Sequence, residues 1–281
     1  MIEAQQIPTN DGIVLGARLF SPSEVPKAGI IINSAMAVKQ SYYRDFACFL
    51  ARNGYLVLTY DYRGIGKSTI ENQRDKRLTL RAWGESDLVA VIDWCSKRAK
   101  SLEWHCICHS VGGQIVGLAS NNTRFASVYC VSSQSGYWGH WDARYQPKLL
   151  FGWYCAFPLL SNVLGWVPGV LWGGENLPAG IAREWAFWAR HKDYVVDQHG
   201  LPIREGFERL QCDMKFLLID DDKDFAPEKA VCALRDFYSN ANTDIEVIQT
   251  SSIGNTSIGH FGFFRKEFKE SLWRNVLGWL D

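Results

Sequence analysis

One serine of this 281-residue chain stands in a setting that could make it a nucleophile. Ser110 follows a short, mostly apolar stretch at 104–107 and precedes residues 114–119, which have helical character. A strand, a sharp turn with serine at its apex and a helix form the setting of a nucleophile elbow, which requires small residues two positions before and after the serine. Gly112 meets this requirement, and Cys108, where glycine is usual, meets it in part. The alternative is a serine that merely caps the helix, since serine is also a common N-cap residue.

Acyl transfer at a serine needs a base to take the hydroxyl proton and a carboxylate to orient that base. An acidic turn at 220–227 follows a predicted strand, and His260 stands in a loop just before the last predicted helix. The chain order serine, aspartate, histidine therefore fits a catalytic triad. Asp222 and Asp224 are the two candidates for the acid, and Lys223 between them cannot accept a hydrogen bond from the imidazole.

The composition indicates a large apolar core and balanced charge. Hydrophobic residues make up 47% of the chain, and 30 basic residues balance 30 acidic ones. This excludes general disorder and gives no sign of nucleic acid or an anionic membrane surface as a partner. The N-terminus lacks the apolar core of a signal peptide, and no apolar run reaches the ~20 uninterrupted residues of a membrane span. We expect a cytoplasmic protein whose eight scattered cysteines are reduced thiols and bind no metal.

Apolar strands alternate with amphipathic helices after an initial hairpin at 7–20. Further strands are predicted at 28–33, 55–60, 104–107, 127–131, 215–219 and 244–249. Helices are predicted at 42–53, 80–98, 114–119, 227–238 and 266–280. This alternation predicts an α/β fold with a doubly wound, mostly parallel sheet.

The alternation stops between residues 136 and 209, where seven of the twelve tryptophans lie, Trp172 among them. This interval has helical stretches such as 179–192 but no convincing strand. We therefore divide the chain into a core at 1–135 and 210–281 and a helical, aromatic-rich lid insertion at 136–209. The longest apolar stretch, 149–170, is broken by glycines and prolines, and we expect it to be buried or to face the substrate.

Several runs make the sequence resemble an α/β-hydrolase of the serine aminopeptidase-like type, and more narrowly a bacterial family of about this length. The resemblance covers nearly the whole chain. It rests on residues 9–12, 43–46, 61–68, 83–84, 109–114, 134–138, 176–180, 184–186, 225–227 and 259–265. It implies the α/β-hydrolase fold and hydrolase chemistry.

The resemblance also implies roles for individual residues. It favours Asp222 over Asp224, and it makes His109 a structural residue that points away from the reaction. The oxyanion hole of this fold uses the N–H after the nucleophile, here that of Val111, and one from the loop at 33–38. Relatives place His-Gly in that loop and this chain has Ser-Ala, so the second donor is Ala35 or Met36.

These observations predict a serine hydrolase that cleaves a small-molecule carboxylic ester or thioester without a cofactor. The aromatic insertion predicts an apolar or aromatic substrate, with Tyr137, Trp138 and Trp185 as contacts. The same residues could serve an acyltransferase or cyclase in which a second substrate replaces water. A non-catalytic binding module is the third alternative, favoured by the departures at Cys108, Ser34 and Lys223. The motifs carry no signal for the oligomeric state.

Overall fold

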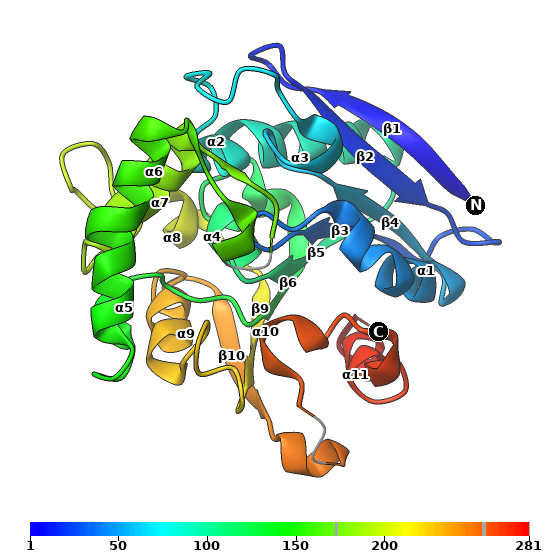
Figure 1. Cartoon of the computed structure of the whole chain (residues 1–281). Coiled ribbons are helices and arrows are strands. Elements are labelled where there is room, and N and C mark those ends of the chain that lie inside the picture. Colours follow the sequence, from blue (N-terminus) through cyan, green and yellow to red (C-terminus); the bar gives the residue numbers. More distant parts are fainter. Residues whose placement is uncertain (172–173, 255–256, 281) are drawn as a thin grey trace.

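The computed structural model describes residues 1–171, 174–254 and 257–280, so Trp172 lies outside the described residues. An eight-stranded sheet has the order β1-β2-β4-β3-β5-β6-β9-β10 (Figure 1). Its strands are β1 (Ile2–Pro8), β2 (Val14–Phe20), β3 (Ala28–Asn33), β4 (Tyr55–Tyr60), β5 (Trp104–His109), β6 (Phe125–Val131), β9 (Asp213–Ile219) and β10 (Asn242–Ile248). Only β2 runs antiparallel to its neighbours, β1 and β4, and every other pair is parallel. The predicted α/β class and mostly parallel sheet are confirmed.

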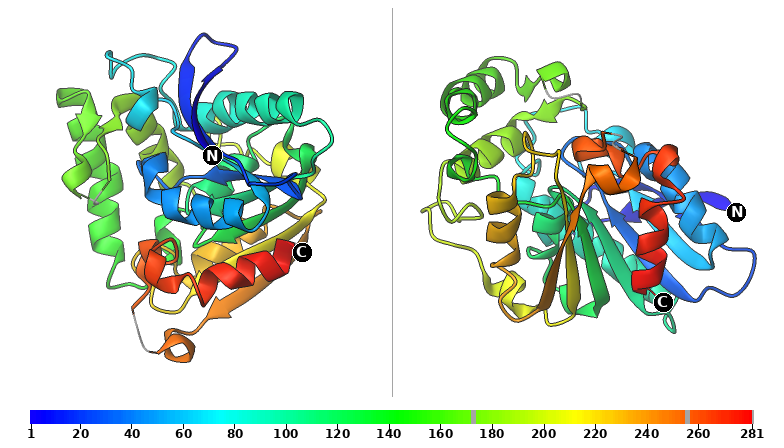
Figure 2. Two further views of the ribbon diagram at one scale, coloured as in Figure 1. Left: turned by 90° about the vertical axis from the view of Figure 1, so that its right-hand side faces the viewer. Right: turned by 90° about the horizontal axis from the view of Figure 1, so that it is seen from below.

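Helices cover both faces of this sheet (Figure 2). The covering helices are α1 (Arg44–Arg52), α3 (Val89–Arg98), α4 (Gly112–Val116), α9 (Glu228–Arg235) and α11 (Leu272–Leu280). Side chains alternate between faces along a strand, so Ile107 of β5 packs with α1 and α11 while Cys106 and Cys108 pack with α3, α4 and α9. The central strands are therefore buried on both sides, which explains their continuous apolar sequences.

Two predicted helices are interrupted. The helix expected at 80–98 consists of α2 (Leu80–Ala82), a π-helical stretch (Trp83–Leu88) and α3. The helix expected at 266–280 begins as a 3-10 turn (Lys266–Phe268), and α11 begins only at Leu272. The N–H groups of Phe268 and Lys269 bond three residues back instead of four, and this tighter winding accompanies the burial of Phe268 in the core.

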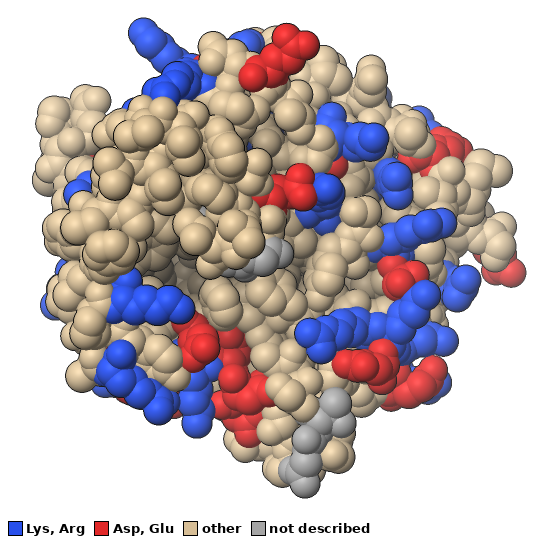
Figure 3. Space-filling model, viewed as in Figure 1, with Lys and Arg blue, Asp and Glu red and all other residues tan. Residues whose placement is uncertain are grey.

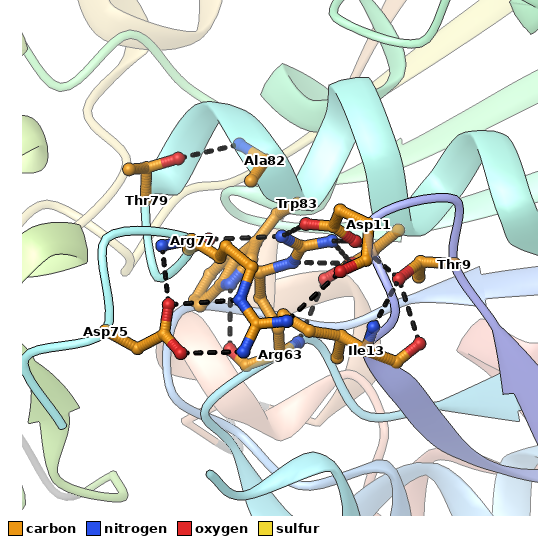
Figure 4. A network of polar contacts seen from close by, with 10 residues as sticks. Thr9, Asp11, Ile13, Arg63, Asp75, Arg77, Thr79, Ala82 and Trp83 are labelled. Atoms are coloured by element: carbon orange, nitrogen blue, oxygen red, sulfur yellow. Dashed lines mark hydrogen bonds and ion pairs between the residues drawn. The ribbon is translucent and has the colours of Figure 1, made fainter. Parts of the chain in front are cut away.

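A buried arginine attaches the β1–β2 hairpin to the rest of the molecule (Figure 4). Arg63, in the loop after β4, donates from Nη1 to Asp11 Oδ2 in the hairpin turn (2.6 Å). Its Nε donates to Asp87 Oδ1 in the π-helical stretch (2.7 Å), and Nη1 also donates to the carbonyl of Arg77 (3.1 Å). One side chain thus joins four segments that are distant in sequence.

The interval 136–209 contributes no strand to the eight-stranded sheet among its described residues. Its helices are α5 (Gln146–Phe151), a π-helical stretch (Gly152–Ala156), α6 (Phe157–Val163), α7 (Ala179–Ala189) and α8 (Glu205–Arg209). It also contains a short antiparallel pair, β7 (Trp166–Val167) and β8 (Leu177–Pro178), which the sequence does not predict because each strand has only two residues.

The expectation that 149–170 is buried is wrong for one side of this segment, and the expectation that it faces the substrate stays a prediction. Trp153 is buried and Phe157 packs against the core, but Phe151, Leu159 and Val163 are exposed to solvent. An amphipathic helical arrangement explains the difference, since only one face can pack on the molecule. None of the described helices combines the length and hydrophobicity of a membrane crossing.

Candidate active site

The turn after β5 holds Ser110 in a backbone conformation that residues other than glycine rarely adopt. Its φ is +54°, its N–H continues the sheet by donating to Val131 O (2.9 Å), and α4 begins two residues later. Left-handed backbone of this kind costs free energy and is typical of functional sites. Ser110 is buried, and its Oγ makes no hydrogen bond to the described residues.

Small residues let other segments approach this turn closely. A Cβ at Gly112 would lie 2.6 Å from Asn33 O at the end of β3, and one at Gly113 would lie 2.6 Å from Ser133 Cβ. Cys108 stands where glycine is usual, and its side chain points into the core, with Sγ 3.5 Å from Cys106 Sγ. A cysteine is tolerated there because its neighbour on the same face of β5 is another small thiol.

His260 and Asp222 meet beside this turn. Asp222 follows the C-terminal end of β9, and His260 lies in the short helix α10 (Gly259–Gly262). Asp222 Oδ2 lies 2.6 Å from His260 Nδ1, and both side chains are buried. This contact places the proton of a neutral imidazole on Nδ1 and leaves Nε2 free to accept one. Phe225 stacks on the imidazole ring at a centroid distance of 4.9 Å.

Asp224, the other candidate acid, is exposed, and no bond between it and His260 is recorded within the described residues. Its backbone carbonyl accepts a hydrogen bond from Trp141 Nε1 (2.9 Å), which ties the acidic turn to the interval 136–209. The geometry therefore brings only one of the two predicted aspartates to the histidine.

Asp221 has a positioning contact that the sequence does not reveal. Its carboxylate accepts hydrogen bonds from Ser257 Oγ (2.8 Å), Ile258 N (3.0 Å) and Gly259 N (2.8 Å). These three donors immediately precede His260. A predicted turn aspartate therefore fixes the segment that carries the histidine, and only proximity in the fold could reveal this contact.

His109 links the two loops that flank the elbow. Its Nε2 lies 2.8 Å from the carbonyl of His260, and its Nδ1 lies 2.8 Å from the hydroxyl of Tyr43. Burial lowers the pKa of His109 well below its ordinary value, so the ring is neutral. Because a carbonyl can only accept, Nε2 carries the proton and Nδ1 accepts from Tyr43. His109 therefore supports the backbone of His260.

The hydroxyl of Tyr43 also contacts one of the three backbone N–H groups predicted as oxyanion donors. The N–H of Ala35 donates to the hydroxyl of Tyr43 (2.8 Å), so it already has a partner. No hydrogen bond is recorded for the N–H groups of Met36 and Val111 among the described residues. Of the three predicted oxyanion donors, Ala35 is therefore the one whose N–H already has a bonding partner.

The predicted substrate contacts all lie in the interval 136–209. Tyr137 and Trp138 are half-buried, with ring centroids 5.4 Å apart. Trp185 packs against Trp153 (4.8 Å between centroids), and its Nε1 donates to the hydroxyl of Tyr194 (3.0 Å). That hydroxyl donates in turn to Gln114 of α4 (3.0 Å), so Trp185 is connected to the helix that follows Ser110.

Solved structures resemble this chain over its full length. An esterase of Pyrococcus furiosus has a TM-score of 0.60 at 16% identity, with 100% of this chain and 91% of that chain covered. A thermostable carboxyl esterase of Bacillus coagulans has a TM-score of 0.65 at 11% identity, covering 99% and 97%. An esterase of Exiguobacterium antarcticum has a TM-score of 0.62 at 13% identity, covering 99% of each chain. These likenesses show a shared fold.

No curated protein matches the sequence significantly. Residues 24–165, just over half of the chain, match the family described as serine aminopeptidase, S33. The match includes β3 with its following loop, β5 and the Ser110 turn, and it agrees with the order of the sheet and with the similar structures. The chain therefore belongs to the serine aminopeptidase S33 family of the α/β-hydrolase superfamily.

Proposed function

We propose that this protein hydrolyses a carboxylic ester or thioester through an acyl-enzyme on Ser110. The observation that carries the proposal is the 2.6 Å contact between His260 Nδ1 and Asp222 Oδ2, beside a serine held in left-handed backbone. The similarity to esterases of three organisms supports the choice of an ester.

In the first half of the reaction, Ser110 Oγ attacks the acyl carbon while His260 Nε2 takes the hydroxyl proton. Asp222 orients the imidazole and stabilises its charged form. The N–H groups of Val111 and Met36 bind the oxyanion, each contributing roughly 3 kcal/mol. His260 then gives the proton to the departing alcohol or thiol as the bond to the acyl carbon breaks.

In the second half, water attacks the acyl-enzyme. His260 takes a proton from the water and returns it to Ser110 Oγ as the acid leaves. Phe225, stacked on the imidazole, shields one face of the ring from solvent. Within this proposal residues 136–209 act as a lid, because Trp141 bonds to the acidic turn and Tyr194 bonds to α4. The aromatic side chains Tyr137, Trp138 and Trp185 favour an apolar or aromatic substrate.

A fluorophosphonate probe and p-nitrophenyl esters of graded acyl length test the proposal. We expect wild-type protein to be labelled and to turn over esters, with both lost in Ser110→Ala and His260→Ala. The exposed His199, replaced by alanine, is the matched control and should keep both activities. Labelling that survives in Ser110→Ala would exclude this serine as the nucleophile. Product formed with an added alcohol in place of water would instead identify an acyltransferase.

A further inference from the structure

An exposed apolar face lies on the outer side of α5 and α6. The apolar residues on it are 45% to 67% exposed, and we call them the apolar face: Phe151, Tyr154, Leu159, Val163 and Leu164. They are five of the fourteen large apolar residues exposed in the described chain, although they come from a segment of only 14 positions. Contiguous exposed apolar surface of this kind marks an interaction site, whereas scattered residues do not.

Charged side chains are absent from the apolar face itself. The sequence has no Asp, Glu, Lys or Arg from Leu149 to Gly174. The space-filling view shows a broad area free of charge over α6, with Lys and Arg along its left and lower edges and with acidic residues beside them at the lower edge (Figure 3).

Three arginines contact the helical segment that carries the apolar face. The guanidinium of Arg190 lies over the ring of Tyr154, 5.3 Å from its centroid. Arg183 Nη1 donates to Asn162 Oδ1 (3.2 Å), and Arg74 Nη2 donates to Asn162 O (2.9 Å). These three arginines also line a groove of about 620 Å³ together with Lys76, Leu78, Pro158 and Phe187.

The carboxylates of the same groove are already neutralised. Asp75 Oδ2 lies 2.7 Å from Arg77 Nη2, and Glu184 Oε1 lies 2.7 Å from Arg81 Nε. The positive charge of Arg74, Arg183 and Arg190 is therefore not balanced by the acidic residues beside it. The net charge of the whole chain is zero, so it does not reveal this local excess of positive charge.

We propose that the apolar face and its bordering cations dock on an anionic lipid surface. A helix with apolar side chains on one face and Lys or Arg beside it can lie in the interface, with the apolar residues among the upper acyl chains and the cations at the phosphates. A second copy of this chain fits less well, since symmetric pairing would bring two cationic borders together. This inference concerns binding and stands independently of the proposed reaction.

Sedimentation with vesicles tests the proposal on the full-length protein. Phosphatidylcholine vesicles with and without phosphatidylglycerol are compared, at low and high salt. We expect binding to the anionic vesicles that weakens with salt. Leu159→Gln with Val163→Gln should lower the partition coefficient at least about tenfold, because the bound protein loses two apolar side chains that the membrane would bury. Arg74→Gln with Arg183→Gln, both exposed and both at the border of the apolar face, should lower it about fivefold per charge.

Val25→Gln is the matched control, because Val25 is 89% exposed but lies far from this segment in sequence, between β2 and β3. All substituted side chains are exposed, so unfolding midpoints should stay unchanged and separate lost binding from lost structure. Equal binding by wild type and the Leu159/Val163 variant would overturn the proposal. So would sedimentation velocity showing that these residues hold a dimer that does not bind vesicles.

Discussion

At the residue scale, two aspartates separated by one lysine occupy different environments. Asp222 is buried against His260, whereas Asp224 is exposed. If Asp222 orients the imidazole, Asp222→Asn should lower kcat about 10⁴-fold, as in other triads, because an amide favours the wrong tautomer. Asp224→Asn should change kcat little and serves as the control. Steady-state kinetics on a p-nitrophenyl ester measures both, and a larger loss in Asp224→Asn would contradict the proposed assignment.

The sequence predicts the roles of some residues of the candidate site and leaves those of others open. The setting of Ser110 and the later His260 follow from local pattern, since a strand, a turn and a helix are contiguous in the chain. The choice between Ala35 and Met36 could not be made, because it depends on a hydrogen bond from Ala35 N to Tyr43, which is eight residues away. The contacts of Asp221 with residues 257–259 bridge more than thirty positions and have no local signature.

At the scale of elements, α10 has only four residues and depends on its neighbours for its position. Asp221 supplies three of the bonds that hold its start. We expect Asp221→Ala to lower kcat about 10- to 100-fold with KM nearly unchanged, because a displaced base affects chemistry more than binding. Asp221→Asn, which keeps one acceptor oxygen, should recover part of the loss. A variant that loses stability but keeps kcat would show that the contact is only structural.

Strands that are buried on both faces could be predicted from their continuous apolar sequences. The strands at 28–33 and 55–60 agree with β3 and β4 to the residue, because both are almost entirely apolar and are followed by polar turns. The interval 136–209 was harder to predict, because aromatic residues at helical spacing do not reveal which face packs inward. The exposure of Phe151 and Leu159 could therefore be found only in the folded chain.

At the scale of the whole molecule, one buried cation serves two carboxylates. Asp11 is partly exposed, and its pKa is lowered by its hydrogen bonds to Arg63 and Thr9 despite some burial, so it balances the guanidinium. Asp87 is fully buried, and burial raises its pKa to about 7 although Arg63 opposes the shift. The second carboxylate therefore holds its proton over a wide range of pH in the folded protein.

This proton links folding to pH. The folded protein keeps it up to about pH 7, whereas the unfolded chain releases it near the ordinary value of 3.8. The contribution of Asp87 to stability is therefore full below pH 3.8 and is lost as the pH rises to about 7, by on the order of 1 kcal/mol per unit. Buried His109, whose pKa is lowered, acts in the opposite direction up to about its ordinary value of 6.5.

The titrations of Asp87 and His109 have opposite effects on the stability of the wild type and partly cancel. The informative quantity is therefore the difference in unfolding free energy between the wild type and a variant without the Asp87 carboxyl. Asp87→Asn mimics the protonated carboxyl and removes only its titration. We expect the free energy of unfolding of the wild type, relative to this variant, to fall between pH 5 and pH 7 and to level off above it. Urea unfolding across this range measures the difference. A difference that stays constant from pH 5 to pH 7 would mean that Asp87 is ionised throughout and that Arg63 outweighs the cost of burial.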